Sequence, residues 1–206
     1  MFKETINRET KLVLEKITQS ALADKFYLAG GTALAVQLGH RESIDLDWFC
    51  PSDFSNQEIK FELSTLGELK ITSEEKGTIN GTLDDVKVSF LRYQYDLMFP
   101  FFQMDGVKLA DERDIAAMKI DAMSSCGSRK DFIDIYFLLK KYSLVDLIEF
   151  FEKKYHGIDY NKLHILKSLV YFVDADDEPM PRMLEKVDWE KVKKEIRKKA
   201  NEIVEK

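Results

Sequence analysis

The spacing of hydrophobic residues alternates between helical and strand-like patterns through the first half of the chain. Residues 5–20 carry apolar side chains at helical spacing and lead into a short apolar run over 26–29, which predicts a helix followed by a strand. A short helix is expected over 32–38, because the following Gly39 suits the left-handed position after a helix. The apolar run over 44–49 predicts a second strand.

The mixed pattern continues beyond this second strand. Ser55 and Glu58 form a capping-box pattern, which predicts a helix that extends to about residue 66. Three β-rich runs separated by turn residues then predict an antiparallel meander. The expected meander strands cover 69–72, 78–83 and 86–93, and a short edge strand is expected within 103–109.

After residue 110 the hydrophobic spacing becomes helical throughout. Asp111 and Asp114 can cap a helix that ends near Gly127. Four more helices are expected to begin near Arg129, Ser143, Asn161 and Asp188, with an acidic, proline-containing loop over 174–182 before the last. The pattern therefore predicts an α+β protein with two regions, an α/β core over 1–110 and a helical region over 111–206.

Composition narrows the class of protein. The chain has 206 residues, of which 45% are hydrophobic, so it can bury a sizeable core. A net charge of −6 gives no general basic surface for nucleic acid, although residues 191–199 are locally basic; any RNA contact is therefore expected to be local. Two distant cysteines argue against a disulfide framework or a zinc site. We expect a cytoplasmic protein without membrane segments.

The most informative segment joins a glycine pair to two aspartates. Gly30 and Gly31 follow the first strand and open a helix whose N-terminus, at Thr32, offers free N–H groups and the positive end of the helix dipole to a phosphate. Asp45 and Asp47 are two residues apart in the second expected strand, so they project from the same face. Two adjacent carboxylates repel each other unless a cation lies between them, and Mg²⁺ prefers such oxygen ligands.

Simpler interpretations exist for most of these residues. The glycine pair can be only a tight turn, and Arg41 fits a structural ion pair as well as a phosphate contact. Lys119 can extend from an apolar helix to water. Asp131 can be only a partner of the helix dipole, whereas Asp134 lies among apolar residues and is expected to have a partner, Lys119 or Arg41.

Four segments of the chain carry a resemblance to a known family. They are Gly30-Gly31-Thr32-Ala33-Leu34, His40-Arg41-x-Ser43-x-Asp45-x-Asp47, Lys119-x-x-Ala122 and Arg129-Lys130-Asp131-x-x-Asp134-x-Tyr136. Together they resemble the AbiEii/AbiGii-type nucleotidyltransferases of the DNA polymerase β-like superfamily. The resemblance covers roughly residues 5–155, and the first two motifs are specific only in combination.

The resemblance implies a small mixed β-sheet core flanked by helices, with a helical C-terminal half. It also implies transfer of a nucleoside monophosphate from a nucleoside triphosphate to an acceptor, tRNA or protein, by a toxin that has a separately encoded antitoxin. Asp45 and Asp47 would bind Mg²⁺ or Mn²⁺, and Lys119 and Asp134 would complete the catalytic set. The residues expected to contact the nucleotide are Gly30, Gly31, Thr32, Arg41, Ser43, Arg129 and Asp131.

One position departs from the superfamily pattern. Polymerase β-like enzymes commonly supply a third carboxylate from a later strand, and the matching run over 86–91 has Ser89 there. A hydroxyl cannot replace a carboxylate as a base or as an anionic metal ligand. Three interpretations stay open: an active nucleotidyltransferase, a catalytically weak nucleotide-binding module, and an interaction protein in which the acidic pair is incidental.

Overall fold

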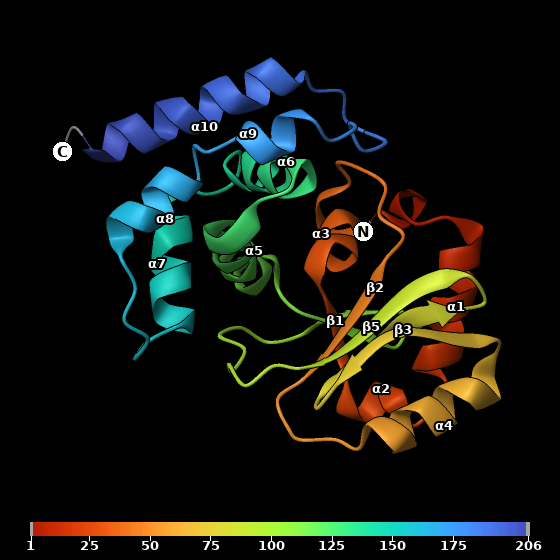
Figure 1. Ribbon diagram of the computed structural model, residues 1–206. Coiled ribbons are helices and arrows are strands. Elements are labelled where there is room, and N and C mark those ends of the chain that lie inside the picture. The colour runs from red at the N-terminus through yellow and green to blue at the C-terminus, as the bar shows by residue number, and fades with distance from the viewer. Residues whose placement is uncertain (1, 205–206) are drawn as a thin grey trace. The chain divides into compact units, whose positions relative to one another are not determined.

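The computed structural model describes residues 2–204 (Figure 1). The chain divides into two compact units, Met1–Asp111 and Glu112–Lys206. The first unit contains the whole β-sheet and the second is helical, so the structure is a mixed α/β fold. Across residues 2–204, no helix combines the length and the apolar character that crossing a bilayer requires.

The first unit is built on a seven-stranded mixed sheet with the order β3-β4-β5-β2-β1-β7-β6. The strands are β1 (Tyr27–Ala29), β2 (Leu46–Cys50), β3 (Leu69–Glu75), β4 (Thr78–Leu83), β5 (Val86–Arg92), β6 (Phe102–Met104) and β7 (Val107–Leu109). The helices are η1 (Lys3–Thr5), α1 (Arg8–Thr18), α2 (Leu22–Lys25), α3 (Gly30–Leu38) and α4 (Asn56–Leu66).

The two faces of this sheet differ in chemistry. On β2, Leu46, Trp48 and Cys50 are buried, and the alternate residues Asp47 and Phe49 point to the other face. Helices α1 and α4 pack against the β3–β5 part of the sheet, as Figure 1 shows. The apolar face therefore anchors β2, and the opposite face displays the aspartate.

The expected meander over β3, β4 and β5 is confirmed, since these strands pair antiparallel in sequence. The expected strand over 44–49 is wrong at its start, because β2 begins at Leu46 and Ile44 is half exposed. The carbonyls of Ile44 and Asp45 accept hydrogen bonds from the side chains of Thr10 and Thr32. Asp45 therefore lies just before the strand, and Asp47 within it.

The edge of the sheet also differs from the expectation. Residues 103–109 form a hairpin of two strands, β6 and β7, instead of one, and both Asp105 and Gly106 at its turn have positive φ. Strand β7 pairs in parallel with β1 through Leu28 and Leu109. This pairing makes β1 an interior strand.

The second unit contains only helices. They are α5 (Glu112–Cys126), α6 (Arg129–Leu138), α7 (Leu144–Lys154), α8 (Lys162–Ser168), α9 (Val173–Asp176) and α10 (Trp189–Val204). Helix α5 packs against α6, α7 and α8, and α10 packs against α6 and α7. The short α9 occupies part of the acidic segment that was expected to be only a loop.

A buried ion pair connects α5 and α7. The Lys154 Nζ lies 2.8 Å from the Asp114 Oδ1, and neither side chain is exposed to solvent. Asp114, which was expected to help cap this helix, thus lies in its first turn and forms a buried ion pair. Leaving one member of such a pair without its partner is costly, because an uncompensated charge remains buried.

We expect Lys154→Met to lower the free energy of unfolding by about 3–5 kcal/mol. The reason is that the Asp114 carboxylate would remain buried without its cation. Chemical denaturation followed by circular dichroism measures the change. The matched control is Lys162→Met, which removes an exposed lysine 3.1 Å from Glu152 and should cost less than about 1 kcal/mol. Equal losses in the two variants would contradict this interpretation.

Candidate active site

The turn from β1 into α3 brings a glycine against an aspartate. Gly30 has φ of +66°, a conformation that residues with a Cβ rarely adopt. A Cβ built on Gly30 would lie 2.7 Å from the Asp47 Oδ2. Sheet register explains the proximity, because Ala29 at the end of β1 pairs with Asp47 on β2. The Asp47 carboxylate therefore lies directly beside the N-terminus of α3.

Gly31 makes a similar close approach to Arg41. A Cβ on Gly31 would lie 2.7 Å from the Arg41 Nη2 and 3.4 Å from the Ser43 Oγ. The Arg41 side chain is only 2% exposed, and its Nη1 donates to the Glu42 carbonyl at 3.0 Å. The structure thus brings a guanidinium to the first turn of α3, where it adds to the positive end of the helix dipole.

Thr32 and Ser43 connect the helix to the segment that carries the aspartates. The Thr32 Oγ1 lies 2.8 Å from the Ser43 Oγ and also donates to the Asp45 carbonyl. The Ser43 N–H donates to the Thr5 carbonyl at 2.8 Å. These bonds hold residues 43–45 against α3, so the two parts of the predicted motif fold into one local cluster.

Asp45 and Asp47 provide a partly exposed pair of carboxylates. The Asp45 side chain is 34% exposed, and its Oδ2 lies 3.9 Å from the Lys87 Nζ. Oxygen donors of this kind suit Mg²⁺, which commonly takes one or two carboxylates and completes its shell with water and substrate phosphates. Within residues 2–204, no group of three His, Cys, Asp or Glu side chains forms a potential metal cluster. The pair fits a Mg²⁺ that is shared with a substrate.

Ser89 occupies the position beside Asp47 on the next strand. Strand β5 runs parallel to β2, with Asp47 opposite Ser89, and β4 places Asn80 opposite Ser89. The Asn80 Nδ2 donates to the Ser73 Oγ on β3 at 3.0 Å. The uncharged side chains of Ser89, Asn80 and Ser73 therefore follow Asp47 across the sheet. A third carboxylate would be expected at the position of Ser89.

Two of the residues around the aspartates did not emerge from sequence reasoning. Lys87 lies two residues before Ser89 on β5 and so faces the same side of the sheet. Asn80 joins the row through the register of β4. The alternation along β5 could have pointed to Lys87, whereas Asn80 requires the strand pairing.

The predicted residues of the second unit form their own charged cluster. The Lys119 Nζ lies 2.6 Å from the Asp131 Oδ1 and 2.8 Å from the Asp134 Oδ2. Asp134 is fully buried, and the expected partnership between Asp134 and Lys119 is confirmed. The other Asp131 oxygen accepts from the Ser128 N–H and Oγ, which caps α6. Asp131 thus has a structural role as part of the N-terminal cap of α6.

Arg129 has several partners within the helical unit. Its side chain is buried, and its Nε and Nη2 donate to the carbonyls of Ala175 and Asp176 at 2.9 and 2.5 Å. The guanidinium also lies 4.9 Å from the centre of the Trp189 ring. These contacts make Arg129 part of the packing of the helical unit, and its contact with the nucleotide stays a prediction.

Asp176 in the same cluster is an electrostatic partner of α10. Hydrogen bonds from Lys193 and from the Trp189 indole lower the pKa of the Asp176 carboxyl below its ordinary value. The carboxylate form is therefore favoured, which supports the packing around Arg129. These contacts strengthen the assignment of this region to stability.

Solved structures of other proteins share the fold of this chain. One is a Helicobacter pylori protein provisionally described as a nucleotidyltransferase, with a TM-score of 0.60, 16% identity and coverage of 95% of this chain and 92% of that chain. Another is MenT4, a nucleotidyltransferase toxin from Mycobacterium tuberculosis H37Rv, with a TM-score of 0.53, 13% identity and coverage of 94% and 84%. At these identities the likeness shows the fold, which is that of nucleotidyltransferases.

Sequence comparison gives the family. Residues 12–97 match the family model described as nucleotidyl transferase AbiEii toxin, type IV TA system. Uncharacterized protein aq_aa25 from Aquifex aeolicus is 36% identical over 208 residues, which cover 97% of this chain and 98% of that protein. Through residues 12–97 the chain belongs to the AbiEii nucleotidyltransferase family. The predicted resemblance is therefore confirmed, and the matched region contains the glycine turn and both aspartates.

We expect Gly30→Ala to weaken Mn²⁺ binding, because the new Cβ would displace the Asp47 carboxylate. It should also cost about 1–2 kcal/mol of stability from the positive φ. Electron paramagnetic resonance of free Mn²⁺ measures the affinity. The control is Gly157→Ala, since Gly157 has φ of +87° and nothing within 4 Å of its Cβ position. If both variants bind Mn²⁺ as tightly as the unmodified protein, Gly30 does not shape a metal site.

Proposed function

We propose that this protein transfers a nucleoside monophosphate from a nucleoside triphosphate to an acceptor, tRNA or protein, with Mg²⁺ or Mn²⁺ as cofactor. The observation that carries the proposal is the Asp47 carboxylate beside Gly30, at the N-terminus of α3. This arrangement offers a cation site and a phosphate site within one turn of chain. The family match supports the same reaction class.

In this proposal, some residues of the first unit bind the triphosphate and others bind the metal ion. Gly30 and Gly31 leave room for the Asp47 carboxylate and the Arg41 guanidinium beside the N-terminus of α3, where the backbone N–H groups would meet the triphosphate. Asp45 and Asp47 would hold the metal ion, which supplies charge neutralisation at the reacting phosphate when bound. The protein contributes mainly position and electrostatics, as this reaction requires.

Lys119 and Asp134 belong to the proposed catalytic set because of their place in the family motif. The buried Asp134 carboxylate fixes the Lys119 ammonium at 2.8 Å and reduces the freedom of its long side chain. A fixed ammonium is suited to interact with phosphate oxygens. Asp131 shares the ammonium and at the same time caps α6, so we give it a supporting role.

The biological setting that we propose is that of a toxin controlled by a cognate antitoxin. The family description, a toxin of a type IV system, supports it, as does the name of MenT4 as a nucleotidyltransferase toxin. A toxin of this class would modify an abundant acceptor, and tRNA is the first candidate. The gene next to the one for this chain is the place to look for the antitoxin.

With Mg²⁺, labelled nucleoside triphosphates and total tRNA, we expect the purified protein to transfer label to RNA, and Asp45→Asn or Asp47→Asn to reduce transfer to background. Loss of a carboxylate removes an anionic ligand of the metal. Asp53→Asn is the control, because Asp53 is exposed and pairs with Arg92 away from the glycine turn. Nucleotide binding without transfer to any RNA or protein pool would contradict the enzymatic assignment.

Ser89 favours a second candidate, a catalytically weak nucleotide-binding protein that retains the fold. Its hydroxyl lies beside Asp47 in the sheet and is 6% exposed, so no anionic ligand comes from this position. On this second account the two aspartates bind nucleotide and metal, but turnover is slow because the acceptor hydroxyl lacks a nearby carboxylate.

Ser89→Asp distinguishes the two candidates. We expect a carboxylate at this position to tighten Mn²⁺ binding, because a third anionic ligand would join Asp45 and Asp47. A rise of tenfold or more in transfer rate would show that the natural protein is limited by the missing acid. An unchanged rate would favour an enzyme that is already complete. Ser89→Asn is the control, because asparagine has nearly the same size as aspartate but carries no charge.

A further inference from the structure

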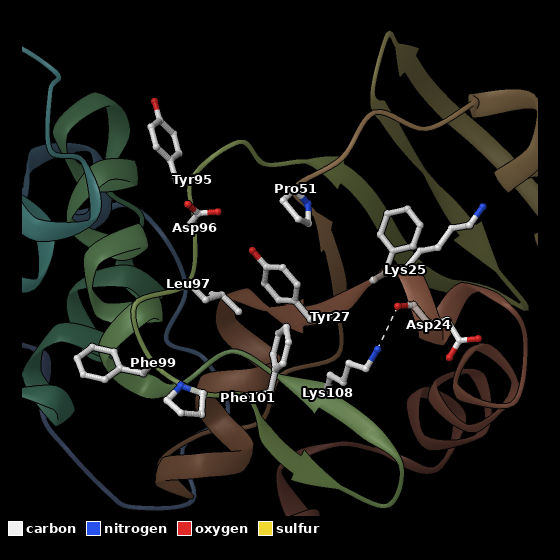
Figure 2. Close-up of a pocket in the computed structure, with 12 residues that line it drawn as sticks. Asp24, Lys25, Tyr27, Pro51, Tyr95, Asp96, Leu97, Phe99, Phe101 and Lys108 are labelled. Carbon is white, nitrogen blue, oxygen red and sulfur yellow. Dashed lines mark hydrogen bonds between the residues drawn. The ribbon is translucent and has the colours of Figure 1, made fainter.

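A cavity of about 340 Å³ opens in the first unit at the end of β2. Its lining includes Tyr27 at the start of β1, Pro51 just after β2, and Tyr95, Phe99 and Phe101 from the segment that leads into β6. Figure 2 shows the Tyr27 and Phe101 rings side by side, and their centroids are 5.4 Å apart. Five of the twelve residues that line the cavity are therefore aromatic.

Some of these aromatic rings lie on the same face of the sheet as Asp47. Asp47 and Phe49 are two residues apart on β2, so they share one face of the sheet, about 7 Å apart along the strand. Phe49 pairs with Tyr27 across the strands, and the two rings stack with centroids 6.0 Å apart. On its other side Phe49 contacts Tyr93, which contacts Tyr95. Packed rings thus extend from the cavity to Phe49, which follows Asp47 on the same face of the sheet.

The strand register places the cavity on one side of Asp47 and the glycine turn on the other. Ala29, which precedes Gly30, pairs with Asp47, whereas Tyr27 pairs with Phe49. In phosphoryl transfer the attacking and leaving oxygens lie roughly in line on opposite sides of the phosphorus. If the leaving pyrophosphate lies at the N-terminus of α3, the acceptor hydroxyl approaches from the side of Phe49 and Tyr27.

Charged groups at the cavity fit a nucleotide better than an apolar ligand. Lys25 and Lys108 lie at its margin, where Lys108 donates to the Asp24 carbonyl at 3.0 Å, as Figure 2 shows. Lysines there can meet backbone phosphates. Asp96 is also among the lining residues, and a carboxylate accepts hydrogen bonds from the amino groups of bases. A carboxylate at this place favours a base over a bare phosphate as occupant.

We propose that this cavity binds an unpaired base near the reacting end of a single-stranded RNA acceptor. Aromatic rings that stack bases and nearby lysines that meet phosphates are the combination that single-stranded nucleic acid requires. A local site of this kind suits a chain whose net charge is −6. The assignment to the acceptor rests on the proposed transfer reaction, whereas the binding of single-stranded RNA can be tested without it.

The test measures fluorescence anisotropy of a 5′-labelled single-stranded hexanucleotide RNA with the full chain and no nucleoside triphosphate. Phe101→Ala should weaken binding roughly tenfold, because it removes a ring on which a base stacks. The matched control is Phe102→Ala. Phe101 and Phe102 are both 42% exposed, but Phe102 does not line the cavity, so its removal should change the affinity less than about twofold.

A second variant tests RNA binding at the same cavity in case Phe101→Ala does not fold. Lys25→Gln changes an exposed side chain and should reduce the slope of log affinity against log salt by about 0.7, the value for one phosphate contact on a single strand. Binding of labelled nucleoside triphosphate, measured in parallel, should be the same in all three variants and the unmodified protein.

The outcomes separate this inference from the proposed function. RNA binding that depends on Phe101 but without any nucleotide transfer would keep the cavity as an RNA site and reject the enzyme. Transfer to a protein acceptor with no RNA binding would overturn the inference and keep the enzyme. Loss of triphosphate binding in Phe101→Ala, with RNA affinity intact, would assign the cavity to the base of the triphosphate and also overturn it.

Discussion

The candidate site depends on the close approach of the Asp47 carboxylate to the backbone at Gly30. This approach needs a residue without a Cβ and with positive φ at the point where β1 becomes α3. It also needs the antiparallel register that sets Ala29 opposite Asp47. The apolar face of β2, with Leu46 and Trp48 buried, fixes that register and leaves the carboxylate on the opposite face. Core packing thus determines where an anion meets the positive end of a helix.

Much of this arrangement could be predicted because its signals are local. The glycine pair marks the strand-to-helix turn, and the second strand brings the Asp47 carboxylate beside it. The start of β2 could not be predicted in the same way. Side chains of Thr10 and Thr32 occupy the carbonyls of residues 44 and 45, and these bonds come from segments that the local pattern does not describe.

The partners of the charged residues could be predicted only in part, because many of these partners are distant in the sequence. Lys119 and Asp134 pair as expected, since a buried carboxylate requires a cation. Arg129 belongs to the same motif, yet it bonds to the carbonyls of Ala175 and Asp176, more than forty residues away in the chain. Lys87 and Asn80 join the surroundings of the aspartates only through strand pairing. The motif therefore identified Lys119, Asp134 and Arg129. Tertiary contacts gave these residues their partners and brought Lys87 and Asn80 to the aspartates.

The most direct measurement of the central claim is a crystal structure of the protein with Mn²⁺ and a non-hydrolysable nucleoside triphosphate, with the metal located by anomalous scattering. The account predicts a peak bonded to the carboxylates of Asp45 and Asp47, with the triphosphate on the N-terminal N–H groups of α3 beside Arg41. A metal peak elsewhere, or a triphosphate bound away from Gly30 and Gly31, would contradict it.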